Sequence, residues 1–171
     1  MQNNNLQAAL EYRKKYNFSV IPIKPDKKPY IQWTPYQKKR ATTEEIKQWW
    51  TKWPDAMIGI VTGEVSGIFV VDCDTQAGFD TVQNLLPESL VYPQARTPRG
   101  GWHLYFKWLA DYKMTIAAGV MPGVDIRGEG GYIVAPPSVK SDGKAYTWDI
   151  PLEYVALPSL PHSLKSALIN N

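Results

Sequence analysis

The chain has 171 residues, of which 44% are hydrophobic and 20% are charged, with 12 glycines, 14 prolines and a single cysteine. This length can bury one hydrophobic core, and the apolar content is too high for a disordered chain. One cysteine excludes an internal disulfide and a cysteine-based zinc site, and no apolar run is long enough to span a bilayer. With no secretory signal visible at residues 1–5, we expect a cytoplasmic domain without a membrane segment.

The net charge of +3 is unevenly distributed along the chain. Residues 13–40 hold nine lysines and arginines against one acidic residue, Asp26, whereas the remaining residues carry a net charge of −5. This asymmetry favours an N-terminal region that faces a polyanion beside an acidic remainder. A solvated basic surface without a partner would give the same pattern, so both interpretations stay open at this point.

The first half of the chain predicts helices and strands in mixed order. Thr42 and Glu45 have the spacing of a capping box, so a helix is expected to begin there and to end before Pro54. Runs rich in isoleucine and valine predict the strands. In chain order we expect a helix over 6–16, a strand over 18–23, a basic and aromatic loop over 24–40, a helix over 42–53, and strands over 57–61 and 68–74.

The second half predicts more strands, several of them in hairpins. A tight turn at 97–101 would join two of these strands. In chain order we expect a helix over 75–86, strands over 91–96 and 102–108, a helical or irregular piece over 114–121, strands over 124–127, 132–135 and 146–148, and a helix over 163–169. His162 is interpreted as a surface or capping residue of that last helix. Mixed helices and hairpins favour an α+β fold over a parallel doubly wound sheet.

Two aspartates end the strand predicted at 68–74. Residues i and i+2 of a strand share a face, so Asp72 and Asp74 point the same way with Cα atoms about 6.6 Å apart. Two carboxylates after an apolar strand repel each other unless a cation neutralises them. Hard divalent cations such as Mg²⁺ accept such ligands and keep positions open for substrate phosphates. A pair of aspartates at a solvent-exposed strand end is the alternative.

Two further motifs carry polar residues suited to phosphate and metal binding. The Gly100-Gly101 turn permits close approach of the backbone, and its amides can cradle a phosphate that His103 could also contact. Asp125 and Arg127 share a face of the strand at 124–127, from which Asp125 could complete a metal site and Arg127 could neutralise a triphosphate. The alternatives are a structural histidine and an ordinary surface ion pair.

These motifs, in this order and spacing, resemble the bifunctional primase-polymerase (Prim-Pol) domain of the archaeo-eukaryotic primase superfamily. The resemblance extends from the first helix to about Trp148. Gly101 stands at the small-residue position of the second motif, and Arg99 stands where relatives often carry serine. The segments that carry the resemblance are 49–54, 58–63, 70–74, 96–106 and 124–138.

The resemblance implies an N-terminal α/β module packed on an RRM-like catalytic module, with the active site in the cleft between them. The expected bounds are about 1–65 and 66–150, followed by a tail and helix over 151–171. Asp72, Asp74 and Asp125 match the catalytic metal ligands for two Mg²⁺ or Mn²⁺ ions, and His103 matches the histidine that binds the nucleotide phosphates. The further nucleotide-binding candidates are Arg96, Arg99, Gly100, Gly101 and Arg127.

The implied function is metal-dependent transfer of nucleotides from dNTPs or NTPs to a primer 3′ end on a single-stranded DNA template, with initiation of new chains as a second ability. The chain is expected to act as a monomer, in a longer protein with an appended helicase or accessory helical domain. A DNA- and nucleotide-binding module that needs missing domains is one alternative. A D-x-D glycosyltransferase is another, but it leaves the second and third motifs unexplained.

The basic loop over 24–40 interleaves lysines with Tyr30, Trp33 and Tyr36, a composition that suits either a surface that follows a DNA strand or one that faces a triphosphate. The tryptophans at 49, 50 and 53 are interpreted as core packing rather than base stacking, because this helical spacing gives mostly one buried face. The candidate DNA-binding residues are Lys27, Lys28, Lys38, Lys39 and Arg40.

Overall fold

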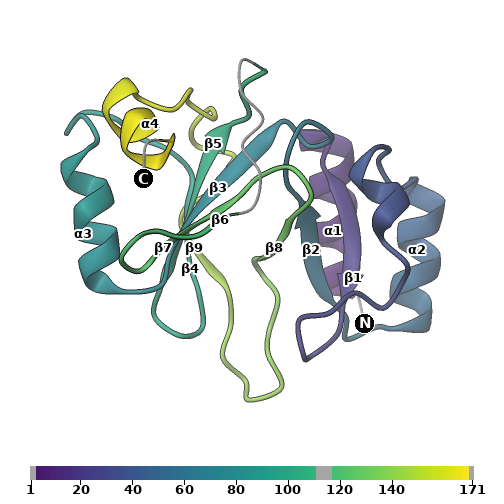
Figure 1. The fold of residues 1–171 in the computed structure, drawn as a ribbon. Coiled ribbons are helices and arrows are strands. Elements are labelled where there is room, and N and C mark those ends of the chain that lie inside the picture. Colours follow the sequence, from purple (N-terminus) through teal and green to yellow (C-terminus); the bar gives the residue numbers. More distant parts are fainter. Residues whose placement is uncertain (1–2, 111–116, 170–171) are drawn as a thin grey trace.

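The computed structural model describes residues 3–110 and 117–169, which form α-helices and two antiparallel sheets (Figure 1). The first elements are α1 (Asn4–Tyr16), β1 (Ser19–Ile23), the 3₁₀ helix η1 (Thr34–Gln37), α2 (Thr43–Lys52), β2 (Met57–Val61), β3 (Ile68–Cys73) and α3 (Gln76–Asn84). The others are β4 (Gln94–Arg96), β5 (Trp102–Lys107), β6 (Ala117–Met121), β7 (Val124–Arg127), β8 (Tyr132–Ala135), β9 (Thr147–Ile150) and α4 (His162–Ile169). The predicted α+β class is confirmed.

Side-chain caps begin the α-helices α1, α2 and α3. The side chain of Asn3 accepts hydrogen bonds from the N–H groups of the first turn of α1. Thr42 and Glu45 form the predicted capping box of α2, in which each side chain accepts a hydrogen bond from the backbone N–H of the other residue. Thr75 Oγ1 accepts from the N–H of Gly78 at 3.0 Å and begins α3 directly after the Asp72–Asp74 segment. These bonds satisfy donors that a helix leaves unpaired at its N-terminus.

The two sheets differ in size and in where their strands come from. The smaller sheet has the order β1-β2-β8, and the larger sheet has the order β6-β7-β3-β5-β4-β9. β8 lies within the segment expected to form the catalytic module, yet it pairs with β2 from the N-terminal segment. The smaller sheet therefore joins the start of the chain to the segment that directly follows the third motif.

Three hydrophobic clusters hold these layers together. The first contains side chains of α1 and α2 and of both sheets, with Val70 and Tyr105 fully buried in it. The second packs the opposite face of the larger sheet, represented by Val71 and Leu104, against α3 and α4 (Figure 1). The third covers the other face of the smaller sheet, and Trp33 from the basic loop packs against it. Alternate residues of β3 and β5 thus enter different clusters, as the period of two requires.

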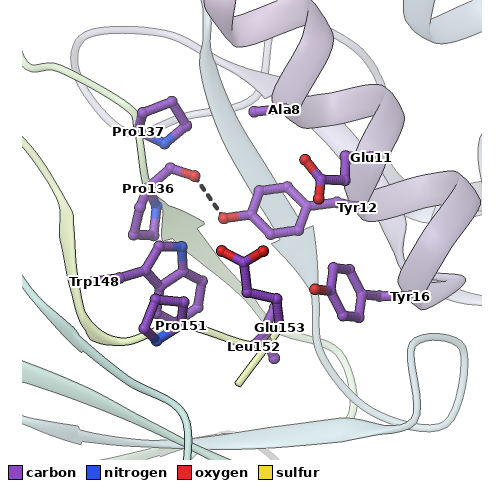
Figure 2. Close-up of a pocket in the computed structure, with 10 residues that line it drawn as sticks. All are labelled: Ala8, Glu11, Tyr12, Tyr16, Pro136, Pro137, Trp148, Pro151, Leu152 and Glu153. Atoms are coloured by element: carbon purple, nitrogen blue, oxygen red, sulfur yellow. Dashed lines mark hydrogen bonds between the residues drawn. The ribbon is translucent and has the colours of Figure 1, made fainter. Parts of the chain in front are cut away.

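A cavity of about 250 Å³ lies beside α1 (Figure 2). The hydroxyl of Tyr12 donates a hydrogen bond to the carbonyl of Pro136 at 2.6 Å, which connects α1 to the chain directly after β8. None of the predicted catalytic, nucleotide-binding or DNA-binding residues lines this cavity. Its lining residues are Ala8, Glu11, Tyr12, Tyr16, Pro136, Pro137, Trp148, Pro151, Leu152 and Glu153.

Several boundaries and one element differ from the sequence prediction. β4 is shorter than the expected strand over 91–96, because Pro93 has no N–H to donate to a ladder. Residues 117–121 form β6 rather than the expected helical or irregular piece, since Gly119 and Gly123 take positive φ values of 63° and 73° and allow an irregular hairpin with β7. Residues 114–116 of that expected piece lie outside the described residues. β9 covers 147–150 instead of 146–148.

Two sequence interpretations about individual residues are confirmed. Trp50 is fully buried and its Nε1 donates to the carbonyl of Ala56 at 3.0 Å, while Trp49 and Trp53 pack against the same core. His162 is exposed at the first residue of α4. Within the described ranges, no helix has the length and apolar character needed to cross a membrane.

Candidate active site

Three polar residues form a row across adjacent strands of the larger sheet. Asp72 on β3 is paired directly with Asp125 on β7 and with His103 on β5. Residues that face each other across antiparallel strands project from the same side of a sheet. Asp74 follows β3 immediately, where its backbone N–H donates to the carbonyl of Gly123 at 2.8 Å. The register thus brings together carboxylates that are more than fifty residues apart in the sequence.

The carboxylates of Asp72, Asp74 and Asp125 form a cluster that fits a divalent cation. One oxygen from each lies within 4.8 Å of the others, and carboxylate oxygens are the ligands that Mg²⁺ and Mn²⁺ accept. The backbone N–H of Gly119 on β6 donates to Asp125 Oδ1 at 2.8 Å and so orients this carboxylate. The donor set therefore fits the metal that the sequence implied.

The electrostatics of the cluster favour a bound cation. Burial raises the pKa of Asp72, while the neighbouring Arg127 lowers it and Asp125 raises it. Partial burial also raises the pKa of Asp74, and the charges of Asp72 and Asp125 add to this effect. The guanidinium of Arg127 lies 3.6 Å from Asp72 Oδ2 and 3.9 Å from Asp125 Oδ2. One arginine thus faces three carboxylates, which leaves net negative charge at the site.

His103 is buried within this charged group. Its Nε2 lies 3.6 Å from Asp72 Oδ1, and 6% of the residue is exposed. Burial lowers the pKa of His103 to about 4, and the positive charge of Arg127 contributes to the decrease. The imidazole is therefore neutral at pH 7, so it offers one N–H donor and one nitrogen acceptor rather than a positive charge.

The turn at 97–101 packs tightly against the end of β3. Gly100 has a φ of 86°, and a Cβ atom on Gly101 would lie 2.5 Å from the carbonyl oxygen of Cys73. Thr97 Oγ1 accepts a hydrogen bond from the N–H of Gly101 at 3.0 Å. The guanidinium of Arg96 lies 4.2 Å from the centroid of the Trp102 ring, and it donates to the carbonyls of both glycines. Arg96 therefore stabilises the turn through these two hydrogen bonds.

Two adjoining cavities open on this group of residues. The larger, of about 500 Å³, includes the turn at 97–101, and the smaller, of about 280 Å³, includes Trp33 and residues 130–134. They meet at five residues that line both of them, namely Lys27, Asp72, His103, Arg127 and Tyr146. The site therefore lies between the loop that follows β1, the start of β8 and the face of the larger sheet.

The family model described as bifunctional DNA primase/polymerase, N-terminal (Prim-Pol), matches residues 9–162. The chain belongs to the Prim-Pol family. The matched segment runs from α1 to the start of α4 and contains the acidic cluster, His103 and the glycine turn. Prim-Pol membership implies a nucleotidyltransferase of the DNA primase/polymerase type. A comparison with curated proteins gives no match.

The basic residues of this Prim-Pol domain divide into groups. Lys27 lines both site cavities, whereas Lys28 is exposed and lines neither. Lys38, Lys39 and Arg40 line a separate cavity of about 360 Å³ that also contains Glu64 and Glu129. Arg40 is held in place, because its Nε donates to the carbonyl of Asn17 at 2.7 Å. Arg99, predicted to contact the nucleotide, lines the larger site cavity.

The aromatic residues of the basic loop are mostly used for packing. The Tyr30 ring stacks on Trp53 with centroids 4.5 Å apart. The Tyr36 ring contacts Trp49 edge to face, and its hydroxyl donates to Glu45. These contacts attach the loop to α2. Trp33 differs, because it lines the smaller site cavity.

Sequence reasoning did not identify Tyr132 and Tyr146 as residues of the site. Tyr132 contacts the Trp33 ring edge to face at 5.0 Å, and burial raises the pKa of Tyr146 to about 12. The His103 and Tyr146 rings lie 6.1 Å apart between centroids. Tyr132 ends the third motif, which was a usable signal. Tyr146 lies in no motif, and only the fold brings it to the site.

Proposed function

We propose that this Prim-Pol domain is a metal-dependent nucleotidyltransferase that extends DNA chains on a single-stranded template. The proposal rests above all on the row formed by Asp125, Asp72 and His103, with Asp74 beside it. Of these residues, Asp72, Asp74 and His103 line an open cavity bordered by the glycine turn. A cluster of carboxylates that can hold metal ions, next to groups that can bind phosphate, suits metal-assisted phosphoryl transfer. It suits hydrolysis catalysed by one general base less well.

In the proposed reaction, the 3′-hydroxyl oxygen of the primer attacks the α-phosphorus of the incoming nucleotide. A new phosphorus–oxygen bond forms, the bond to the bridging oxygen breaks, pyrophosphate leaves, and the hydroxyl proton is released. Asp72, Asp74 and Asp125 would hold two Mg²⁺ or Mn²⁺ ions. Bound there, these ions supply Lewis-acid stabilisation of the attacking and leaving oxygens.

The remaining site residues would bind and orient the phosphates. Neutral His103 can donate its ring N–H to a phosphate oxygen without adding a charge beside Arg127. The glycine turn is packed rigidly against β3, and the N–H groups of Gly100 and Gly101 already donate to the carbonyl oxygen and Oγ1 of Thr97, each at 3.0 Å. A phosphate bound by these amides would therefore have to replace Thr97 as their acceptor. Arg127 would share its charge between the carboxylates and the triphosphate.

Template binding is assigned to the basic segment at 38–40. This segment is exposed and lines a cavity next to the turn at 128–131. Gly130 lines the smaller site cavity, and its Cβ position would lie 4.0 Å from Gln37 Oε1, so the two cavities are neighbours. Contacts of lysine and arginine with the DNA backbone would make binding strongly dependent on salt.

Product analysis on single-stranded DNA tests this proposal. Circular single-stranded DNA, labelled dNTPs and Mn²⁺ are incubated with the protein, with and without an annealed primer. Incorporation without a primer would establish initiation as well as extension. Incorporation only with a primer would place the initiation element outside these residues, in an accessory helical or helicase domain. No incorporation in either reaction would contradict the proposal and favour a DNA- and nucleotide-binding module.

Two aspartate variants supply the matched comparison. Asp72→Asn removes one carboxylate of the cluster and is expected to abolish incorporation. Asp55→Asn removes the same charge from an exposed residue after α2, and this variant is expected to incorporate nucleotides as the wild type does. Equal rates in the two variants would contradict the assignment of the acidic cluster.

A further inference from the structure

We infer that Lys27, from the loop after β1, binds the triphosphate of the incoming nucleotide together with His103 and the glycine turn. This inference rests on the proposed function and deepens it, because it assigns a nucleotide ligand outside the three sequence motifs. The sequence places Lys27 among five DNA-binding candidates, in a loop whose composition suits either a DNA strand or a triphosphate. The structure separates it from the segment at 38–40, which lines a different cavity.

Lys27 stands where the two site cavities meet. It lines both of them together with Asp72, His103 and Arg127, and it comes from the loop after β1, whereas the other three come from the larger sheet. A ligand in the larger cavity, against the turn at 97–101, would therefore contact a surface to which Lys27 and residues of the acidic cluster both contribute. The triphosphate is the part of a nucleotide whose charge suits this position.

The loop that carries Lys27 is held in place at several points. The hydroxyl of Tyr132 donates to the carbonyl of Lys27 at 2.6 Å, and the N–H of Lys24 donates to the carbonyl of Lys28 at 2.8 Å. The Tyr30 ring stacks on Trp53 next to α2. A loop fixed in this way loses little conformational entropy when a ligand binds.

The backbone of Lys27 supports a ligand role. Its φ of 71° is a left-handed conformation that residues with a Cβ atom rarely adopt. Such conformations persist where the surrounding structure holds them, and they gather at ligand sites. At Lys27, the hydrogen bond from Tyr132 and the turn closed by Lys24 hold the backbone in this conformation.

The charges at the site leave Lys27 available for an anion. Arg127 is already paired with Asp72 and Asp125. Among the described residues, no carboxylate oxygen lies within 4.0 Å of the Lys27 ammonium. A triphosphate that binds beside three carboxylates needs positive charge near it, and Lys27 can supply such a charge.

A phosphate of the DNA backbone has the same chemistry as a nucleotide phosphate, so the test measures both ligands separately. The dissociation constant of dATP is measured with Ca²⁺ and without DNA, and that of a single-stranded oligonucleotide is measured without nucleotide. The variant is Lys27→Met, which keeps the Cβ atom and so leaves the backbone strain unchanged. Lys28→Met removes the same charge one residue away, and Lys14→Met removes it from the exposed side of α1.

Lys27→Met is expected to weaken dATP binding about tenfold or more, because a charge-assisted hydrogen bond is removed, and to weaken dAMP binding much less. Its affinity for the oligonucleotide and its Tm should match those of Lys14→Met. A decrease in dATP affinity that is equal in Lys27→Met and Lys28→Met would mean that only the overall charge of the loop matters, which overturns the inference.

Two other results would also overturn it. If the wild type binds dATP and Lys27→Met binds it with a dissociation constant within about twofold of the wild-type value, Lys27 does not bind the triphosphate. The same conclusion follows if Lys27→Met weakens only oligonucleotide binding. If the wild type itself does not bind dATP, the proposed function fails and the inference fails with it. The wild-type measurement therefore distinguishes the failure of the assignment from the failure of the function.

Discussion

Replacing Gly101 with alanine tests how closely the glycine turn and the acidic cluster depend on each other. The added Cβ atom would lie 2.5 Å from the carbonyl oxygen of Cys73, a backbone atom that cannot rotate away. Because such contacts are essentially never shorter than 3.0 Å, either β5 or the end of β3 must move by roughly half an ångström. Overpacking of this kind costs about 1–3 kcal/mol, which lowers Tm by about 2–12 °C in a domain of this size.

The same displacement should slow catalysis. A misplacement of about 1 Å at a reacting centre costs about 100-fold in rate, so half of that predicts a decrease of about tenfold in primer extension. Tm is measured by circular dichroism and the rate by single-nucleotide extension. Gly143→Ala separates steric contact from backbone strain, because Gly143, unlike Gly101, has a positive φ of 86°, whereas a Cβ atom there meets nothing within 4 Å. Wild-type Tm and rate in Gly101→Ala would refute the packing argument.

Three further predictions concern individual side chains. Tyr12→Phe removes the buried hydrogen bond to Pro136 beside the cavity of Figure 2, so thermal melting should show a decrease in stability of about 1–2 kcal/mol while the extension rate stays unchanged. Tyr132→Phe removes the bond that holds the Lys27 loop and should weaken dATP binding about fivefold; unchanged binding would show that the loop does not need this bond. Neutralising Lys38 and Lys39 together should make the plot of log affinity for single-stranded DNA against log salt concentration less steep. The slope should change by about 0.7 for each phosphate that the variant no longer neutralises. An unchanged slope would show that this segment does not contact the template.

Much of the local structure could be predicted because the signals are local. The capping box at Thr42 and Glu45 and the alternating or continuous apolar runs depend on neighbours in the sequence. Strand spacing already suggested that Asp125 could complete a metal site and that His103 could contact a phosphate, and the resemblance assigned roles to Asp72, Asp74, Asp125 and His103 as one group. The cross-strand register then explains how they come together.

What the sequence did not reveal depends on long-range pairing. β8 joins the sheet of β1 and β2, and this pairing brings Tyr132 to the carbonyl of Lys27, 105 residues earlier in the chain. No periodicity encodes such a contact, because many registers bury similar side chains. Residues 117–121 were misjudged for a related reason, since two glycines with positive φ permit a hairpin where the local composition suggests none.

The most direct test of the central claim is single-nucleotide addition to a primer annealed to four templates that differ only in the first templating base. The wild-type protein with Mn²⁺ is predicted to add the complementary nucleotide in each case, Asp55→Asn to do the same, and Asp72→Asn to add none. Addition that ignores the template, or addition that survives in Asp72→Asn, would contradict the account of this site as a centre for templated nucleotidyl transfer.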